Sequence, residues 1–129
     1  MRMIRTAAAI AVLSVVGIGA VAVPAQAKGS DITRSGDCSG VTNWKLKVGP
    51  EDGRLEVEGQ IDSNRSWQHW SWSISQDGRV KASGRAVTGG TSGSFSVRRL
   101  LANSAGTDTI VLRASRTATG ETCRGVVVF

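Results

Sequence analysis

The chain of 129 residues predicts an all-β fold: a seven-stranded antiparallel sandwich of two sheets with one disulfide. Three observations predict it. From Val41 onward, apolar and polar residues alternate with a period of two, the spacing of half-buried strands rather than helices. Turn-forming Gly, Asp, Asn and Pro separate the apolar runs at short intervals. The only two cysteines, Cys38 and Cys123, flank this region.

Residues 1–27 have the pattern of a secretory signal peptide. Arg2 and Arg5 give a positive start, residues 7–23 are almost wholly apolar, and residues 25–27 read Ala-Gln-Ala, a small-x-small cleavage site. We therefore expect cleavage after residue 27 and release of a secreted, extracellular protein that makes no further contact with the membrane.

The remaining 102 residues have the length of one domain. We expect a polar lead-in at 28–37 followed by a single domain at 38–129. Residues 1–27 hold two of the 16 basic residues and none of the 10 acidic ones, so the remainder has a formal net charge of 14 minus 10, or +4. This balance suits anionic cell-wall polymers or acidic partners, and also simple solubility. In an exported chain, two cysteines predict a Cys38–Cys123 bridge rather than a metal site or a nucleophile.

The first two strands are expected at residues 41–48 and 55–61, joined by a turn at 49–53. The first run places Trp44 on one face with a leucine and a valine, and two lysines on the other. The second alternates apolar residues with two glutamates and a glutamine. Opposite outer charges favour pairing of these two strands.

The next two strands are expected at residues 66–75 and 79–87, with Gln76-Asp77-Gly78 interpreted as a three-residue hairpin loop. That register pairs large core residues with small ones, whereas a two-residue loop would place Ile74 beside Lys81. The expected core pairs are Ile74 with Val80, Trp72 with Ala82, and Trp70 with Gly84. The expected outer pairs are Trp67 with Val87 and His69 with Arg85.

The last three strands are expected at residues 94–100, at 109–115 and from Cys123 onward. The closing Val-Val-Val triplet leaves open which of its side chains are buried. Short strands at this spacing predict a two-sheet sandwich, with a barrel as the alternative. The first and last strands of such sandwiches commonly run side by side and parallel, which would bring both cysteines to one end.

Five blocks of the chain resemble small secreted proteins that recur in actinobacteria. These blocks are residues 38–47, 53–58, 93–97, 105–110 and 119–123. The strand pattern is also similar to immunoglobulin-like and fibronectin type III-like β-sandwich domains. The resemblance implies export and this fold, and it transfers no catalytic or binding residue.

The residue pattern contains no recognisable catalytic or metal set. His69 is the only histidine, and a neighbouring Arg85 would be a poor partner for a general base. No Gly-x-Ser-x-Gly elbow occurs, and one histidine with two bridged cysteines cannot form the usual zinc site. Basic residues are not dense enough for nucleic-acid binding. We therefore expect a monomer that is not an enzyme and has no cofactor, metal or nucleic-acid partner.

The tryptophans give the only candidate binding site. Trp44, Trp70 and Trp72 fall in phase with core residues, which leaves Trp67 on the outer face. The candidate site is therefore Trp67, His69, Arg85 and Val87. We expect a secreted non-catalytic binding domain for an envelope glycan or an extracellular protein. The alternative is an inhibitor of an extracellular hydrolase that acts through the loop at 88–93 or 101–108.

Overall fold

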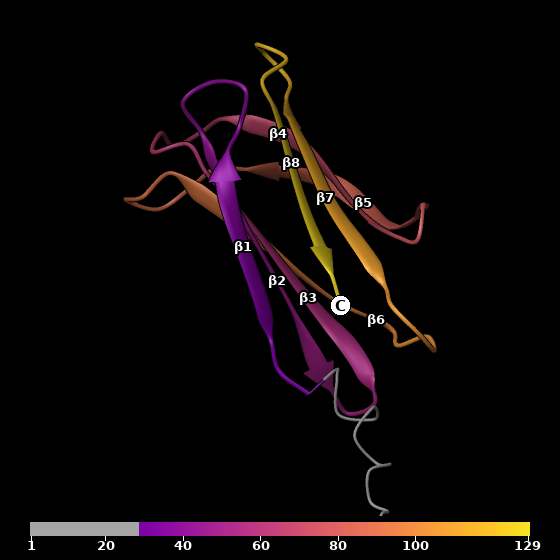
Figure 1. The fold of residues 1–129 in the computed structure, drawn as a ribbon. Helices are drawn as coiled ribbons and strands as arrows, with labels where there is room; N and C mark the ends of the chain where they lie inside the picture. Colours follow the sequence, from indigo (N-terminus) through magenta and orange to yellow (C-terminus); the bar gives the residue numbers. More distant parts are fainter. Residues whose placement is uncertain (1–28) are drawn as a thin grey trace, which may run out of the picture.

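The computed structural model describes residues 29–129 and consists of two four-stranded antiparallel sheets (Figure 1). The eight strands are β1 (Ile32–Asp37), β2 (Asn43–Glu51), β3 (Arg54–Asp62), β4 (His69–Gln76), β5 (Arg79–Val87), β6 (Ser94–Ala102), β7 (Thr109–Arg116) and β8 (Thr122–Val128). The first sheet has the order β1-β2-β3-β6 and the second β5-β4-β7-β8. The all-β, two-sheet fold class is confirmed. The expected signal peptide at 1–27 lies outside the described residues.

The expectation of seven strands is wrong, because β1 forms within the segment expected to be a polar lead-in. It pairs with β2 along its whole length, from Ile32 opposite Val48 to Asp37 opposite Asn43. It is the edge strand of its sheet, and only Ile32 and Gly36 are half-buried. Backbone pairing therefore holds β1 more than side-chain burial does, so no apolar alternation marks it in the sequence.

The core lies between the inner faces of the two sheets. The tryptophans expected inside are there: Trp70 is fully buried, Trp72 is buried, and the half-buried Trp44 packs against the core. Val127 completes the core from β8, while Val128 is exposed. Each fully buried aliphatic or aromatic side chain contributes about 1.5–3 kcal/mol. Among the described residues, the fully buried aliphatic side chains are Leu46, Val48, Leu55, Val57, Ile61, Ile74, Ile110, Leu112 and Val127.

The β4–β5 hairpin has a different register from the one expected. Its turn is the two-residue pair Asp77-Gly78, with φ of 50° and 86°, and the ladder shifts by one residue between Ile74 and Ser75. This β-bulge leaves Lys81 unpaired, so Ile74 still faces Ala82 rather than the lysine. Val80, expected inside, is instead 65% exposed. The expected three-residue loop is wrong because a bulge supplies the extra residue.

The register shift moves every pair expected in this hairpin. Trp72 pairs with Gly84 rather than Ala82, and Trp70 with Ala86 rather than Gly84. Large side chains therefore still lie opposite small ones. On the outer face, His69 lies opposite Val87, and Arg85 lies opposite Ser71 rather than His69.

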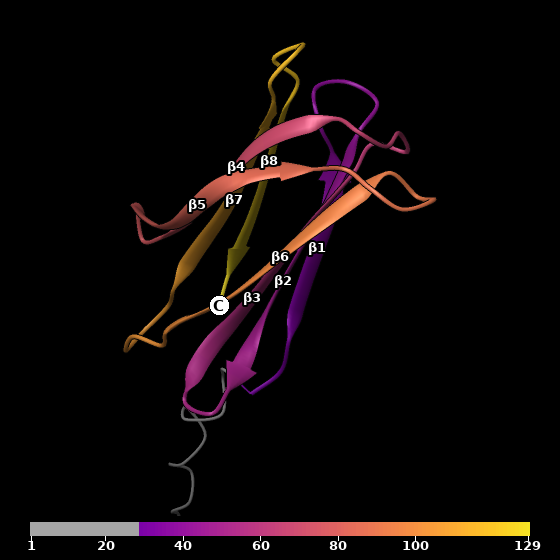
Figure 2. The same cartoon turned by 180° about the vertical axis from the view of Figure 1, so that it is seen from behind.

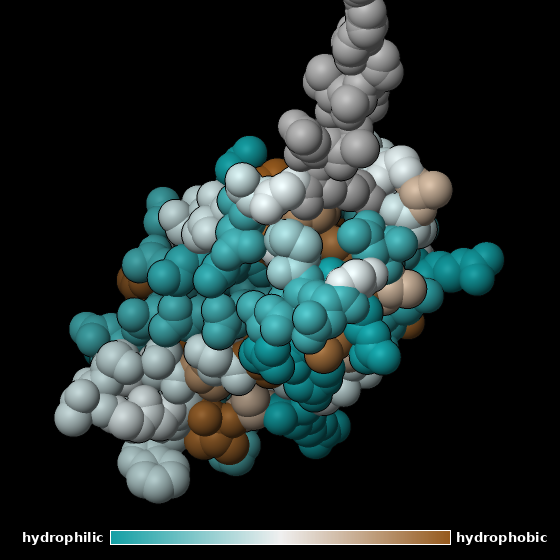
Figure 3. All heavy atoms as spheres, turned by 90° about the horizontal axis from the view of Figure 1, so that it is seen from below, coloured by the Kyte–Doolittle hydropathy of each residue, from teal (hydrophilic) through white to brown (hydrophobic). Residues whose placement is uncertain are grey.

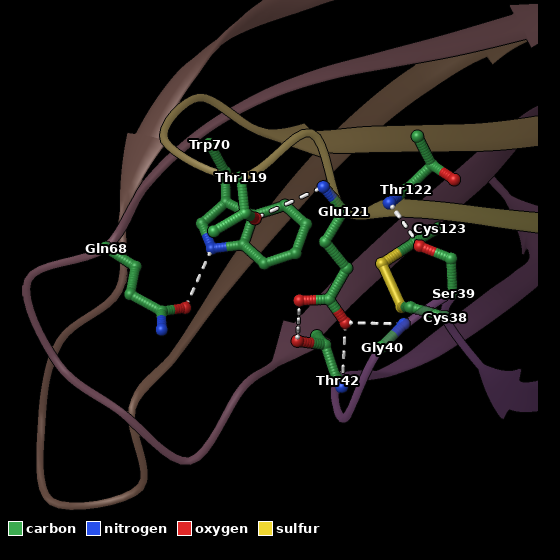
Figure 4. Close-up of a disulfide and its surroundings, with 10 residues drawn as sticks. All are labelled: Cys38, Ser39, Gly40, Thr42, Gln68, Trp70, Thr119, Glu121, Thr122 and Cys123. Atoms are coloured by element: carbon green, nitrogen blue, oxygen red, sulfur yellow. Dashed lines mark hydrogen bonds between the residues drawn. A yellow bond between two sulfur atoms is a disulfide. The ribbon is translucent and has the colours of Figure 1, made fainter.

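The expected disulfide is confirmed between Cys38 and Cys123 (Figure 4). Cys38 follows β1 and Cys123 lies in β8, so the bond joins the two sheets rather than two paired strands of one sheet. Beside it, the Glu121 carboxylate accepts hydrogen bonds of 3.0 Å from the backbone N–H of Gly40 and of Thr42, and from the Thr42 hydroxyl. We call this part of the sandwich the disulfide end.

The chain changes sheets three times, after β3, after β5 and after β6, and the connection between β5 and β6 is one of these crossings (Figure 2). Residues 88–93 form this connection, which closes on itself where Gly89 bridges Ser94. The same residues hydrogen-bond to the segment before β4, so two loops that are distant in sequence lie together at the start of the second sheet.

Candidate functional site

Trp67 is exposed and stands clear of the core. Its side chain is 81% accessible, whereas Trp70, three residues later, is fully buried. Its backbone has φ of +67°, in the left-handed region that bulky side chains rarely adopt. Such a conformation costs about 1–3 kcal/mol and persists only where the surroundings enforce it.

Hydrogen bonds between two loops enforce this conformation. The Trp67 N–H donates to the Thr88 carbonyl at 2.8 Å, and the Thr88 N–H donates to the Gln68 carbonyl at 2.9 Å. The Gln68 N–H donates to the buried Thr88 hydroxyl at 2.9 Å. Further along, the Ser66 hydroxyl donates to the Gly90 carbonyl at 2.7 Å. The loop bearing Trp67 is therefore tied to the 88–93 connection at several points.

The residue after Trp67 turns inward. Gln68 is buried, and its side-chain carbonyl accepts a 3.2 Å hydrogen bond from the Trp70 indole N–H (Figure 4). This bond satisfies the one polar group of a fully buried tryptophan. Gln68 and Trp70 therefore fix the backbone after Trp67, and the bond from Ser66 to Gly90 fixes it before Trp67.

The four candidate residues lie near the same end of the second sheet, although not in the pairs expected. His69 and Val87 lie opposite each other, and Arg85 is the next outward-facing residue along β5. The backbone N–H of Trp67 meets Thr88 rather than Val87. His69 and Arg85 are exposed, and Val87 is 43% accessible. We call Trp67, His69, Arg85 and Val87 the Trp67 patch.

The patch presents side chains that can contact a partner. Within residues 29–129, the His69 ring makes no hydrogen bond or ion pair, so no carboxylate orients it. The described part of the chain also contains no group of three side chains able to hold a metal ion. An exposed indole, an imidazole and a guanidinium remain, groups that stack on or hydrogen-bond to a partner.

Sequence reasoning missed two features of the disulfide end. Val41 lies in the loop between β1 and β2 and is 85% exposed, although alternation suggested that a strand begins there. A shallow cleft of about 440 Å³ lies nearby, lined in part by Val41, Arg116 and Glu121. The Nε atom of Arg116 is buried without a hydrogen-bond partner. Only the strand order could have revealed this cleft, because it joins two loops 79 residues apart.

The surface seen from below has no broad hydrophobic area. It is mostly hydrophilic, and hydrophobic residues are exposed there singly rather than as a broad patch (Figure 3). No helix among the described residues is long and apolar enough to cross a membrane.

The fold and surface together define a disulfide-linked antiparallel β-sandwich that presents a loop-borne tryptophan. Comparisons with protein-family models, curated proteins and solved structures give no match for this chain.

Proposed function

We propose that this chain is a secreted, non-catalytic binding domain that contacts an envelope glycan or another extracellular protein through the Trp67 patch. One observation carries the proposal: an 81% exposed tryptophan held in a left-handed backbone. Folding gains little from an indole that remains in water, and the backbone conformation is costly. A role in contact with a partner explains why this position holds tryptophan rather than glycine.

The setting of the patch supports the same proposal. Binding anchors are most effective when they are rigid, because less conformational entropy is then lost on association. The hydrogen bonds between residues 63–68 and the 88–93 connection supply that rigidity. The disulfide is consistent with an extracellular location, and the pattern of residues 1–27 is the one expected of an export signal.

The test is a pull-down with the purified domain on isolated cell walls and on secreted proteins. Trp67→Ala should reduce capture of the partner at least tenfold, since tryptophan anchors typically contribute about 2 kcal/mol or more. Arg85→Ala should reduce it less. Val80→Ala is the matched control, because Val80 is an exposed apolar residue of β5 at the opposite end of that strand from Arg85 and Val87. If both patch variants capture every partner as well as the wild type does, the proposal is wrong.

Fluorescence offers an independent readout on the same protein. Of the four tryptophans, only Trp67 is exposed, so acrylamide should quench mainly its emission. A partner bound at the patch should shield this fraction from quenching. Trp67→Phe should remove both the quenchable fraction and the shielding.

A second candidate is inhibition of an extracellular hydrolase. The hydrogen-bonded pair of loops that carries Trp67 favours it, since a rigid protruding loop resists rearrangement in an active site. Assays across proteases and glycosidases separate the candidates: an inhibitor lowers turnover by the captured enzyme, and a binding domain does not.

A further inference from the structure

The outer face of the second sheet carries basic side chains without any acidic ones. Residues paired across neighbouring strands point to the same side, and those that alternate with the buried core residues point outward. One outward row runs from Arg85 through Ser71 and Ser115 to Thr122, and the next from Ser83 through Ser73 and Arg113 to Arg124. Lys81 lies further along β5, at the bulge. We call these two rows the basic face.

The excess positive charge of the domain is concentrated on this side. Three of the 16 basic residues lie in residues 1–28, so the described part of the chain has 13 basic and 10 acidic residues. The basic face and Lys81 account for four basic residues and no acidic ones, which leaves nine basic and 10 acidic residues elsewhere. The rest of the domain is therefore close to neutral.

Arg113 and Arg124 lie directly opposite each other on β7 and β8. Directly opposed like charges destabilise a pair of strands. In the part of the chain that the structure describes, no ion pair links either arginine to a carboxylate. The acidic residues that adjoin β4, β7 and β8 are engaged elsewhere: Asp77 accepts from the Thr109 N–H, Asp108 from the Gln76 side chain, and Glu121 from Gly40 and Thr42.

The first sheet shows the opposite arrangement. Its outer face alternates charge across strands, with Lys47 opposite Glu58 and Glu58 opposite Arg98. Lys47 pairs with Asp31 at 3.5 Å, and Arg98 forms an ion pair with Glu56. The sequence thus balances charge on one face and leaves it unbalanced on the other, where an external anion can compensate it.

A cleft lies across the paired arginines. Its volume is about 450 Å³, and the outward side chains that line it come from β4, β7 and β8. They are Ser71, Ser73, Arg113, Ser115, Thr122 and Arg124. Guanidinium groups form strong, bidentate hydrogen bonds to acidic groups, and the four hydroxyls add both donors and acceptors.

We propose that the basic face binds a linear polysaccharide bearing acidic groups, with Arg113 and Arg124 holding an acidic group and the hydroxyls contacting the sugar. This inference rests on the proposed function, because it takes a glycan as the class of partner and specifies that the glycan is acidic. Single-stranded nucleic acid is less well matched, because its successive bases stack on several aromatic side chains, whereas the two rows contain none and Trp67 is the one exposed tryptophan near them. Four hydroxyls lie in the cleft with the arginines, which suits a polyhydroxylated ligand.

The experiment measures binding of the domain to dextran sulfate and to polygalacturonate, with uncharged dextran and duplex DNA as competitors. We expect either anionic polymer to bind and uncharged dextran not to, and the stronger binder identifies the preferred acidic group. The variant Arg113→Gln/Arg124→Gln should weaken binding about tenfold or more. The matched control, Arg34→Gln/Arg54→Gln, removes two exposed charges from the first sheet and should change binding less than about twofold.

Folding is checked in the same samples. Removing the opposed charges should leave the melting temperature of Arg113→Gln/Arg124→Gln equal to or above that of the wild type at low salt. Equal weakening by the two double variants, absence of binding to both anionic polymers, or stronger competition by DNA would each overturn the inference. If the arginine pair proves dispensable while Trp67→Ala still abolishes capture, this inference fails and the proposed function stands. If the arginine pair is required but Trp67→Ala has no effect on any partner, the role of the Trp67 patch fails instead.

Discussion

Replacement of Trp67 should reverse the usual ranking of alanine and glycine. At most positions alanine stabilises a fold relative to glycine, because glycine loses more conformational freedom on folding. Trp67 has φ of +67°, where a Cβ atom is penalised and glycine is not. The Trp67→Gly variant should therefore be more stable than Trp67→Ala.

The magnitude follows from two opposing terms. A left-handed conformation costs a residue with a Cβ atom roughly 1–2 kcal/mol, and the extra entropy lost by glycine costs about 0.5–1 kcal/mol. The glycine variant should therefore exceed the alanine variant by about 0.5–1 kcal/mol. Because Trp67 is 81% exposed, the small packing contribution lost is the same in both variants and cancels in the comparison.

Urea unfolding followed by circular dichroism measures the difference. With m-values of about 1–3 kcal/mol/M for small domains, the two midpoints should differ by roughly 0.5 M. Val41 is the matched control, since it is 85% exposed in a loop and is not among the residues with positive φ. At this position the usual ranking should hold, so Val41→Ala should be more stable than Val41→Gly. The reasoning is refuted if Trp67→Ala equals or exceeds Trp67→Gly in stability.

Two further changes test the fold. Replacing both cysteines by alanine opens a loop spanning 85 residues, which should lower the free energy of unfolding by about 4.5 kcal/mol in the chain-entropy model. Urea unfolding of the wild type with and without reductant should give the same loss, and a loss below about 1 kcal/mol would contradict it. Gly125→Ala places a Cβ atom 2.5 Å from the Trp44 ring and should destabilise by about 1–3 kcal/mol, whereas Gly89→Ala, with open space around it, should be nearly neutral. Equal stability of these two variants would show that the Trp44 ring can move aside.

The fold class could be predicted because the alternation of apolar and polar residues indicates which side chains are buried. Trp70, Trp72 and Ile74 were expected inside, and they are buried. Strand β1 could not be predicted in the same way. Its core-facing side includes the exposed Arg34 and the half-buried Gly36, and the glycine is needed because the Trp44 ring lies within 3 Å of where a Cβ atom would be.

The register of the β4–β5 hairpin was predicted wrongly for a different physical reason. The argument against a two-residue loop is that an unbroken ladder would place Lys81 beside Ile74. That argument holds only without a bulge, and a single extra residue restores the correct face for everything beyond it. A β-bulge and a longer loop give the same apolar alternation, so the sequence pattern does not distinguish them.

The candidate site was only partly accessible to sequence reasoning. Trp67 could be singled out as the tryptophan left over from the core, but its left-handed backbone depends on the pairing with Thr88, 21 residues away. The opposition of Arg113 and Arg124 follows from the hairpin that joins β7 and β8. Their proximity to Ser71 and Ser73 depends on β4 and β7 being neighbours, which the alternation does not encode.

The bulge also links the two proposed binding surfaces. With the expected three-residue loop, Arg85 would lie beside His69 and would belong only to the Trp67 patch. The observed register shifts Arg85 to the row that contains Ser71, Ser115 and Thr122. Arg85 therefore belongs both to the Trp67 patch and to the basic face. A glycan that crosses both surfaces would meet this guanidinium between an aromatic contact and the paired arginines, so aromatic and ionic recognition can act on one chain.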